Sequence, residues 1–450
     1  MTTPVRGRRR AWAAVAVSVA AGCSTTPPAC DRACVSQKVE GRFGQAVGDG
    51  PRGDRVAVPD GLASGQPLTE EQAVHLALWN NAAFHEAAAE VDVTRADLVQ
   101  AGLLANPEFF YSFPVSGRDF RYLFDLPIEA VWLRPVRLRV AEAENARAGE
   151  RVTQLALDLI RDTRLAFTDL KLAQDLVKVA ERAVELRGGI AKLTETREAA
   201  GEASKLEVST ARSDALLAAQ DVTRTTYEVT AVQERLRNLT GLSGYGFPLA
   251  ADPAPFDPRT DAPADQLVAE AVATRPDVLA AAAAVRAADE RVRVANLSWF
   301  RLLAIGDATA GNQPYPFGPA FRVTLPIFNQ GQGLKAIAAA QRDQLDRRRL
   351  TVHNQVVQDV RTAHARYHQA RAELDQLRAK TRPEVGGTIR QAETAFKEGN
   401  ATYLIVLEAN RQLIATDARE AQLAADLRRA WAELERAVGR RLAPPEVAAR

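Results

Sequence analysis

The sequence predicts a mainly α protein with a small β part, built from a duplicated unit of helix, β-hairpin, long helix and helix. Three observations predict this fold. A turn motif occurs twice, large apolar residues alternate with polar ones in two separate segments, and residues 134–200 and 331–398 have a continuous helical composition. Internal repeats fix an architecture before any local motif does. Because the repeated unit is nearly half of the chain, we expect two copies of one fold related by pseudo-two-fold symmetry.

The repeated turn has the pattern G-x-A-[ST]-x-L-x-V-x-x-A. It begins at Gly201 in the first copy and at Gly399 in the second. The tripeptide Leu-Pro-Ile recurs in the same way, at residues 126–128 and 325–327. We therefore divide the chain into a first repeat (residues 68–241), a proline-rich linker (242–263), a second repeat (264–440) and a tail (441–450).

The first 22 residues have the features of a secretory signal. Four arginines precede a short apolar run at residues 11–21, which is too short to span a bilayer. Residues 20–23 read AAGC and resemble a bacterial lipobox, so we expect Cys23 to carry a lipid and residues 23–67 to form a tether. Ser24 follows the cysteine, and the absence of Asp there fits sorting to the outer membrane. Ordinary cleavage nearby is the alternative.

The basic net charge belongs to the signal. The formal charge is +2, and removal of residues 1–22 takes away four arginines and no acids, which leaves −2. Nucleic acid is therefore not an expected partner. Cys30 and Cys34 remain, and in an oxidising compartment they can form a local disulfide. A metal site is the alternative, but no histidine accompanies the two cysteines.

Each repeat contains a predicted β-hairpin, over residues 107–130 in the first and 301–328 in the second. Every second residue from 120 to 128 is large and apolar, and the alternate positions include Arg121, Asp125 and Glu129, which is the period of a strand. Residues 302–310 and a segment beginning near Ala320 give the second hairpin. The side chains expected on the polar face are Asp125, Glu129, Arg322 and Thr324. A shifted register would exchange the two faces.

A helix precedes each hairpin and a very long helix follows it. The first helix begins near Thr69, a good N-cap, and ends near Ala105. The helices after the hairpins would reach roughly 100 Å each, at 1.5 Å per residue, which is typical of bundles and coiled coils. Pro383 is expected to kink or interrupt the second of them.

Four strands cannot lie in a membrane alone, because the two edges of the sheet would bury unpaired backbone groups. A closed spanning barrel needs about eight strands or more. Three chains would supply twelve strands, which leaves an interior wide enough for water. We therefore expect a trimeric 12-stranded β-barrel, continued by a long α-helical barrel.

Taken together, these motifs make the chain resemble the outer membrane efflux protein family over roughly residues 66–440. The run AGLLANPEF at residues 101–109 resembles the branch that exports cobalt, zinc and cadmium. The resemblance implies a homotrimeric duct in the bacterial outer membrane that extends into the periplasm. It also implies a periplasmic adaptor, an inner-membrane pump of the resistance-nodulation-division type, no cofactor, no catalysed reaction and a cargo of heavy-metal cations.

The resemblance also assigns roles at the turns. Glu207 and Glu408 match acidic positions that narrow the pore in the family, and three symmetry-related carboxylates would attract cations and repel one another. Either residue could equally be a solvated surface acid. The residues expected to contact the adaptor are Gly201, Ser204, Gly399 and Thr402.

Other readings have less support. His364 and His368 lie four residues apart on a predicted helix, and without a third ligand we interpret them as polar surface, so no metal site is expected. The alternative to a duct is a lipid-anchored periplasmic coiled-coil adaptor or scaffold, but two symmetric hairpins between long helices do not fit it. The chain contains no G-x-S-x-G, H-E-x-x-H or P-loop motif.

Overall fold

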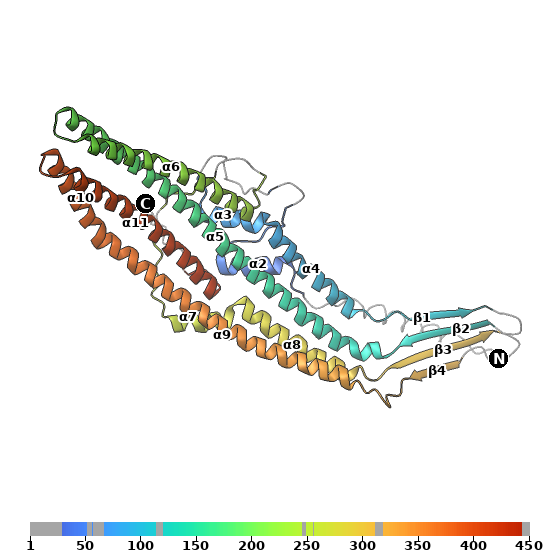
Figure 1. Ribbon diagram of the computed structural model, residues 1–450. Coiled ribbons are helices and arrows are strands. Elements are labelled where there is room, and N and C mark those ends of the chain that lie inside the picture. The colour runs from blue at the N-terminus through green and yellow to red at the C-terminus, as the bar shows by residue number, and fades with distance from the viewer. Residues whose placement is uncertain are drawn as a thin grey trace, which may run out of the picture. The chain divides into compact units, whose positions relative to one another are not determined.

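The computed structural model describes residues 29–51, 56, 67–113, 120–244, 249–254, 256–310 and 318–442 (Figure 1). The predicted signal, Cys23 and most of the predicted tail lie outside these residues. The chain divides into two compact units. The first comprises residues 1–35, 87–153 and 276–354, and the second comprises residues 36–86, 154–275 and 355–450.

The elements occur in the duplicated order that the sequence predicts, which confirms the mainly helical fold. After α2 (Arg32–Phe43), the first copy contains α3 (Glu70–Asn80), α4 (Ala82–Gly102), β1 (Glu108–Ser112), β2 (Phe120–Pro127), α5 (Glu129–Ala199) and α6 (Lys205–Thr240). The second copy contains α7 (Ala264–Thr274), α8 (Pro276–Leu297), β3 (Leu302–Ala310), β4 (Gly318–Val323), α9 (Gln332–Gln376), the π-helix η1 (Leu377–Thr381), α10 (Arg382–Lys397) and α11 (Tyr403–Val438).

The two hairpins form one sheet in the first unit (Figure 1). Its strand order is β1-β2-β3-β4, and every neighbouring pair is antiparallel. The strand predicted over residues 302–310 is confirmed. The fourth strand ends at Val323, so the apolar residues Leu325 and Ile327, which the alternating pattern assigns to it, lie beyond its end.

The helix predicted from Thr69 to Ala105 is wrong in one respect, because it is broken at Asn81. Asn81 ends α3, and its Oδ1 accepts a hydrogen bond of 2.9 Å from the backbone N–H of Phe84 in the first turn of α4. Its Nδ2 donates to the carbonyl oxygen of Leu239 at 3.0 Å. Asn favours such local capping over a helix interior, so this residue starts a new helix.

The interruption predicted at Pro383 is confirmed. The long helix after the second hairpin changes from α9 to the π-helix η1 at Leu377, and Pro383 lies in the first turn of α10. Proline has no N–H to donate and its ring displaces the preceding turn, so a wider turn before it relieves the clash. Helix α5 has no such break over its 71 residues.

Cys30 and Cys34 form a disulfide at the start of α2, which confirms the first of the two readings left open by the sequence. Asn145 on α5, 2% exposed, holds the adjacent backbone. Its Oδ1 accepts from the N–H of Cys30 at 2.7 Å, and its Nδ2 donates to the carbonyl oxygen of Cys30 at 3.1 Å. The disulfide-closed turn is thereby fixed to the helices of the first unit.

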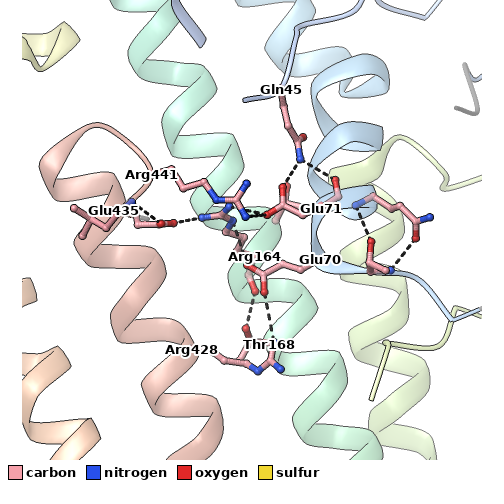
Figure 2. Close-up of polar contacts among 12 residues, drawn as sticks. Gln45, Glu70, Glu71, Arg164, Thr168, Arg428, Glu435 and Arg441 are labelled. Atoms are coloured by element: carbon pink, nitrogen blue, oxygen red, sulfur yellow. Dashed lines mark hydrogen bonds and ion pairs between the residues drawn. The ribbon is translucent and has the colours of Figure 1, made fainter. Parts of the chain in front are cut away.

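A cluster of charged residues, with Arg164 and Glu435 buried at its centre, joins both copies inside the second unit (Figure 2). Arg164 on α5 forms ion pairs with Glu435 on α11 and with Glu70 and Glu71 at the start of α3. Arg441 approaches Glu71 at 2.8 Å. Burial raises the pKa of the Glu70 carboxyl, and the Arg164 guanidinium beside it opposes that shift.

The apolar core of this unit lies around α3, α5 and α6, with Leu76, Phe167, Leu170 and Leu236 at its centre. Within the part of the chain that the structure describes, we find no helix with the length and apolar composition that a bilayer crossing requires.

Candidate functional site

Each repeated glycine lies in a reversal between two helices of the second unit. Gly201 (φ 79°) joins α5 to α6, and Gly399 (φ 77°) joins α10 to α11. In the first turn the N–H groups of Glu202 and Gly201 donate to the carbonyl oxygens of Arg197 and Glu198 at 2.8 and 2.9 Å. The second turn repeats this pattern, which is a Schellman motif. Open space surrounds both glycines, so the positive φ, and not crowding, selects glycine here.

The two helices that follow the turns are capped differently. Ser204 and Glu207 form a capping box at the start of α6: the serine hydroxyl accepts from the Glu207 N–H at 3.3 Å, and the Ser204 N–H donates to the Glu207 carboxylate at 2.7 Å. Thr402 at the start of α11 makes no side-chain capping bond, and Ile405, at the position that corresponds to Glu207, has no side-chain acceptor for the Thr402 N–H. Hydrogen bonds from the backbone and hydroxyl of Ser204 lower the pKa of Glu207 below its usual value.

The two turns pack against each other through one apolar cluster. Phe396, Tyr403, Val406 and Leu407 of the second copy meet Ala211 of the first. The Arg197 guanidinium lies over the Phe396 ring, 4.7 Å from its centroid. Burial of aromatic and aliphatic side chains gives most of the stability of such a contact. The two helical hairpins therefore meet at their ends within one chain.

A buried aspartate adds a polar connection between the same hairpins. Asp214 on α6 is 9% exposed, and its Oδ2 accepts a hydrogen bond of 3.1 Å from the hydroxyl of Tyr403 on α11. The Arg411 guanidinium lies 3.5 Å from the other carboxylate oxygen. Burial and the bond to Asp214 raise the pKa of Tyr403 to about 12. The tyrosine is therefore a neutral donor at physiological pH.

A cavity of about 260 Å³ lies between the two turns. Among the predicted site residues, Glu207, Gly399 and Thr402 line it. Gly201 and Ser204 are close to it in the chain but do not line it. Glu408 is exposed on α11 outside the cavity, where Gln412 donates to it at 3.4 Å. The structure thus brings three of the six predicted turn residues around one polar space.

The sheet has one charged face and one uncharged face. Its register places all five charged residues of the four strands on the same side: Glu108, Arg121, Asp125, Asp307 and Arg322. Two ion pairs cross the strands there, Arg121–Asp307 at 2.7 Å and Asp125–Arg322 at 3.7 Å. The opposite side carries aromatic rings, of which Phe109, Phe124 and Phe321 are exposed and Tyr111 and Tyr122 are half-buried, whereas Phe110 lies on the charged side. Alternation along the strands accounts for this separation.

Two residues assigned to the polar strand face lie elsewhere, so their strand assignment is wrong. Glu129 is the first residue of α5 and is buried, and its carboxylate accepts from the N–H of Leu302 at 3.3 Å. An acid at a helix N-terminus is favourable, which explains its position. Thr324 follows the end of β4, and its N–H donates to the carbonyl oxygen of Arg301 at 3.3 Å.

The sequence interpretation missed Asp214, Tyr403 and Arg411 because no local pattern separates them from other polar residues of long helices. It also omitted Asp307, although the two-residue period places it on the charged face with Ile305 and Leu303. The alternation along the strand could therefore have identified Asp307 from the sequence.

Comparisons with known proteins agree with this architecture. Residues 267–440 match the family model described as outer membrane efflux protein. The cobalt-zinc-cadmium resistance protein CzcC of Cupriavidus metallidurans is 25% identical over 383 residues, which cover 83% of this chain and 90% of that protein.

Several solved structures share the fold, among them CusC and VceC. CusC, in a study of folding and transmembrane channel formation, has a TM-score of 0.70 at 18% identity and covers 82% of this chain and 91% of its own. The outer membrane protein VceC of Vibrio cholerae has a TM-score of 0.70 at 17% identity and covers 82% of this chain and 96% of its own. Residues 267–440 therefore match the outer membrane efflux protein family, and most of the chain is similar in sequence to CzcC and in fold to CusC and VceC.

Proposed function

We propose that this protein is the outer-membrane channel of a tripartite efflux system, a passive exit duct formed by three copies of the chain. The observation that carries the proposal is the sheet: all five of its charged residues share one face, and most of its aromatic residues lie on the other. Phe109 and Phe321 are 66% and 67% exposed in a single chain. A face of this kind is stable against lipid, and the charged face suits a water-filled lumen.

The free edges of the sheet support the assembly of several copies. β1 and β4 are the outer strands, so one edge of each has no partner in the sheet. Lipid cannot satisfy these backbone groups, whereas the β4 edge of one copy can pair with the β1 edge of the next. Three copies would close a barrel of twelve strands, with Asp125 and Arg322 in its lumen. The helices would continue as a tube into the periplasm.

We assign the closed end of the duct to the two glycine turns. The Asp214–Tyr403 bond would hold the hairpins together, and the carboxylates of Glu207 and Glu408 would give the narrow end its negative charge. A periplasmic adaptor would dock at Gly201, Ser204, Gly399 and Thr402, and an inner-membrane pump of the resistance-nodulation-division type would supply the cargo. No residue is given a catalytic or cofactor-binding role.

The proposed cargo is heavy-metal cations, because of the similarity to CzcC. We further propose that residues 1–22 are a signal, that a lipid on Cys23 anchors the protein to the outer membrane, and that residues 23–67 form the tether. The two repeats, 68–241 and 264–440, would be joined by the linker 242–263 and followed by the tail 441–450.

The experiment that tests this function measures conductance and export together. The purified full chain is inserted into a planar bilayer, and a strain that lacks the chain is tested for growth in Co²⁺, Zn²⁺ and Cd²⁺ with and without it. We expect discrete ionic conductance from a trimer and restored metal tolerance. A single-chain mass in detergent without conductance would refute the duct, and conductance without restored tolerance would refute the metal cargo alone.

A further inference from the structure

The linker before the second repeat is held against one face of α9. Arg371 donates to the carbonyl oxygen of Pro258 at 3.2 Å, the Tyr367 hydroxyl donates to the same oxygen at 3.0 Å, and the Tyr367 oxygen accepts from the N–H of Thr260 at 3.2 Å. Tyr367 is 2% exposed and packs on the Trp431 ring, 5.4 Å between centroids. These contacts fix the backbone of residues 258–262 beside α9.

Two histidines on this face point at each other. Nε2 of His364 and Nε2 of His368 are 3.1 Å apart, and Nε2 of His364 is 3.2 Å from the carbonyl oxygen of Ala262. The Tyr367 ring meets the His368 ring edge to face at 5.1 Å. Three donor atoms therefore converge, two imidazole nitrogens and one carbonyl oxygen. His368 is exposed and His364 is partly exposed, so an ion could reach them from solvent.

The spacing of the two nitrogens suits a chelated metal ion. With metal–nitrogen distances of about 2.1 Å, two nitrogens 3.1 Å apart subtend an angle of about 95° at the ion. That angle is close to the right angle between neighbouring ligands in tetragonal sites, which Cu²⁺ and Ni²⁺ prefer. We propose that His364 and His368 bind one divalent transition-metal ion, with the Ala262 carbonyl oxygen as a further donor and water at the open positions.

The two rings can bind one ion through the same type of nitrogen. A neutral imidazole can carry its proton on Nδ1 and present the Nε2 lone pair to a metal ion. The bond from Nε2 of His364 to Ala262 would be exchanged for contacts of both atoms with the metal.

The donor set limits which ions bind. Within the residues that the structure describes, no cluster of three or more His, Cys, Asp or Glu side chains surrounds a metal position, so the protein supplies two nitrogens and a carbonyl oxygen only. Such a site is open and exchanges its ion. By the usual order of affinities, Cu²⁺ should bind most tightly, Ni²⁺ and Zn²⁺ less tightly, and Mg²⁺ not measurably.

The test uses the full chain without a polyhistidine tag, purified in detergent and titrated with Cu²⁺ by calorimetry. We expect one ion per chain, and an electron paramagnetic resonance spectrum with hyperfine coupling to two nitrogens. His364→Gln or His368→Gln should weaken binding at least tenfold and leave coupling to at most one nitrogen. His353→Gln is the control, because His353 lies on the same helix, is exposed and makes a polar contact with the adjacent Asn354.

Metal binding by the two histidines does not depend on transport. A negative binding result would therefore refute the metal site and leave the proposed duct unaffected. The metal-site proposal is overturned if the double variant His364→Gln/His368→Gln binds Cu²⁺ with unchanged affinity and stoichiometry. It is also overturned if the wild-type spectrum shows hyperfine coupling to one nitrogen only. Circular dichroism and elution volume check that each variant is folded. Should a Gln variant misfold, the His364→Asn and His368→Asn variants, whose side chains are shorter, provide the same comparison.

Discussion

The hydroxyl of Tyr403 donates a hydrogen bond of 3.1 Å to the carboxylate of Asp214, and this bond connects the two repeats at the ends of their helical hairpins. Both side chains are buried, 4% and 9% exposed. If the turns form the closed end of a duct, separation of the hairpins must break this bond and expose the apolar cluster around Phe396 and Val406.

Tyr403→Phe should therefore loosen the closed end. The change removes one hydrogen-bond donor from a buried carboxylate, which costs about 1–3 kcal/mol. We expect a higher open probability in planar bilayers, with unchanged single-channel conductance because the lumen is not altered. Tyr227→Phe is the control, since Tyr227 is 74% exposed on α6. Equal open probabilities of the Tyr403→Phe variant and the wild type would show that the bond does not restrain opening.

The same tyrosine should confer a dependence on alkaline pH. Its pKa is about 12 in the folded chain and about 10 when unfolded, so in this interval the unfolded state releases the proton first. The unfolded state then binds fewer protons, and stability falls as the pH rises from 10 to 12. The midpoint of urea unfolding should fall more steeply with pH in the wild type than in Tyr403→Phe. Parallel curves would contradict the assignment.

The unlike caps of α6 and α11 give a matched pair of substitutions. Ser204→Ala removes a capping box and should destabilise the start of α6 by about 1 kcal/mol, whereas Thr402→Ala removes no side-chain bond. Hydrogen exchange, followed by mass spectrometry, should show faster exchange in the first turn of α6 for the first variant only. If Thr402→Ala has the larger effect, the caps are not as described.

These elements differ in how far the sequence predicts them. The glycine turns and the break near Pro383 depend on residues close together in the chain, and local chemistry was enough to place them. The Asp214–Tyr403 bond joins residues 189 positions apart, and Arg164 and Glu435 are 271 apart. Helix composition gives no signal for such pairs. Glu129 fits the alternating pattern of the preceding strand, but in the structure it is the first residue of helix α5.

The buried charges provide a large expected effect on stability. Glu435 is 1% exposed and pairs with Arg164, so Glu435→Gln leaves a buried guanidinium with fewer compensating charges. Removing one partner of a buried pair costs about 3–5 kcal/mol. The control is Asp343→Asn, which breaks the exposed pair with Arg347 and should change stability by less than about 1 kcal/mol. Urea unfolding measures both variants, and similar losses would argue against the special role of the cluster.

The two faces of β2 should respond differently to substitution. Tyr122 lies on the aromatic face and Asp125 on the charged face, three residues along the same strand. Tyr122→Asp places a carboxylate on the surface that we assign to lipid. A basic side chain on the lipid face costs about 2–4 kcal/mol at the bilayer midplane, and an acidic side chain costs less. Asp125→Ser shortens a side chain on the face that we assign to water and removes only the partly exposed pair with Arg322.

We therefore expect Tyr122→Asp to reduce the amount of trimer in isolated outer membranes, and Asp125→Ser to leave it nearly unchanged. Quantitative blotting of heated and unheated membrane fractions measures both. The Tyr122→Phe variant keeps the ring and should assemble normally, which separates loss of the aromatic group from the added charge. If Tyr122→Asp and Asp125→Ser reduce the amount of trimer equally, lipid does not contact one face of the sheet and water the other. The register would then no longer support a barrel.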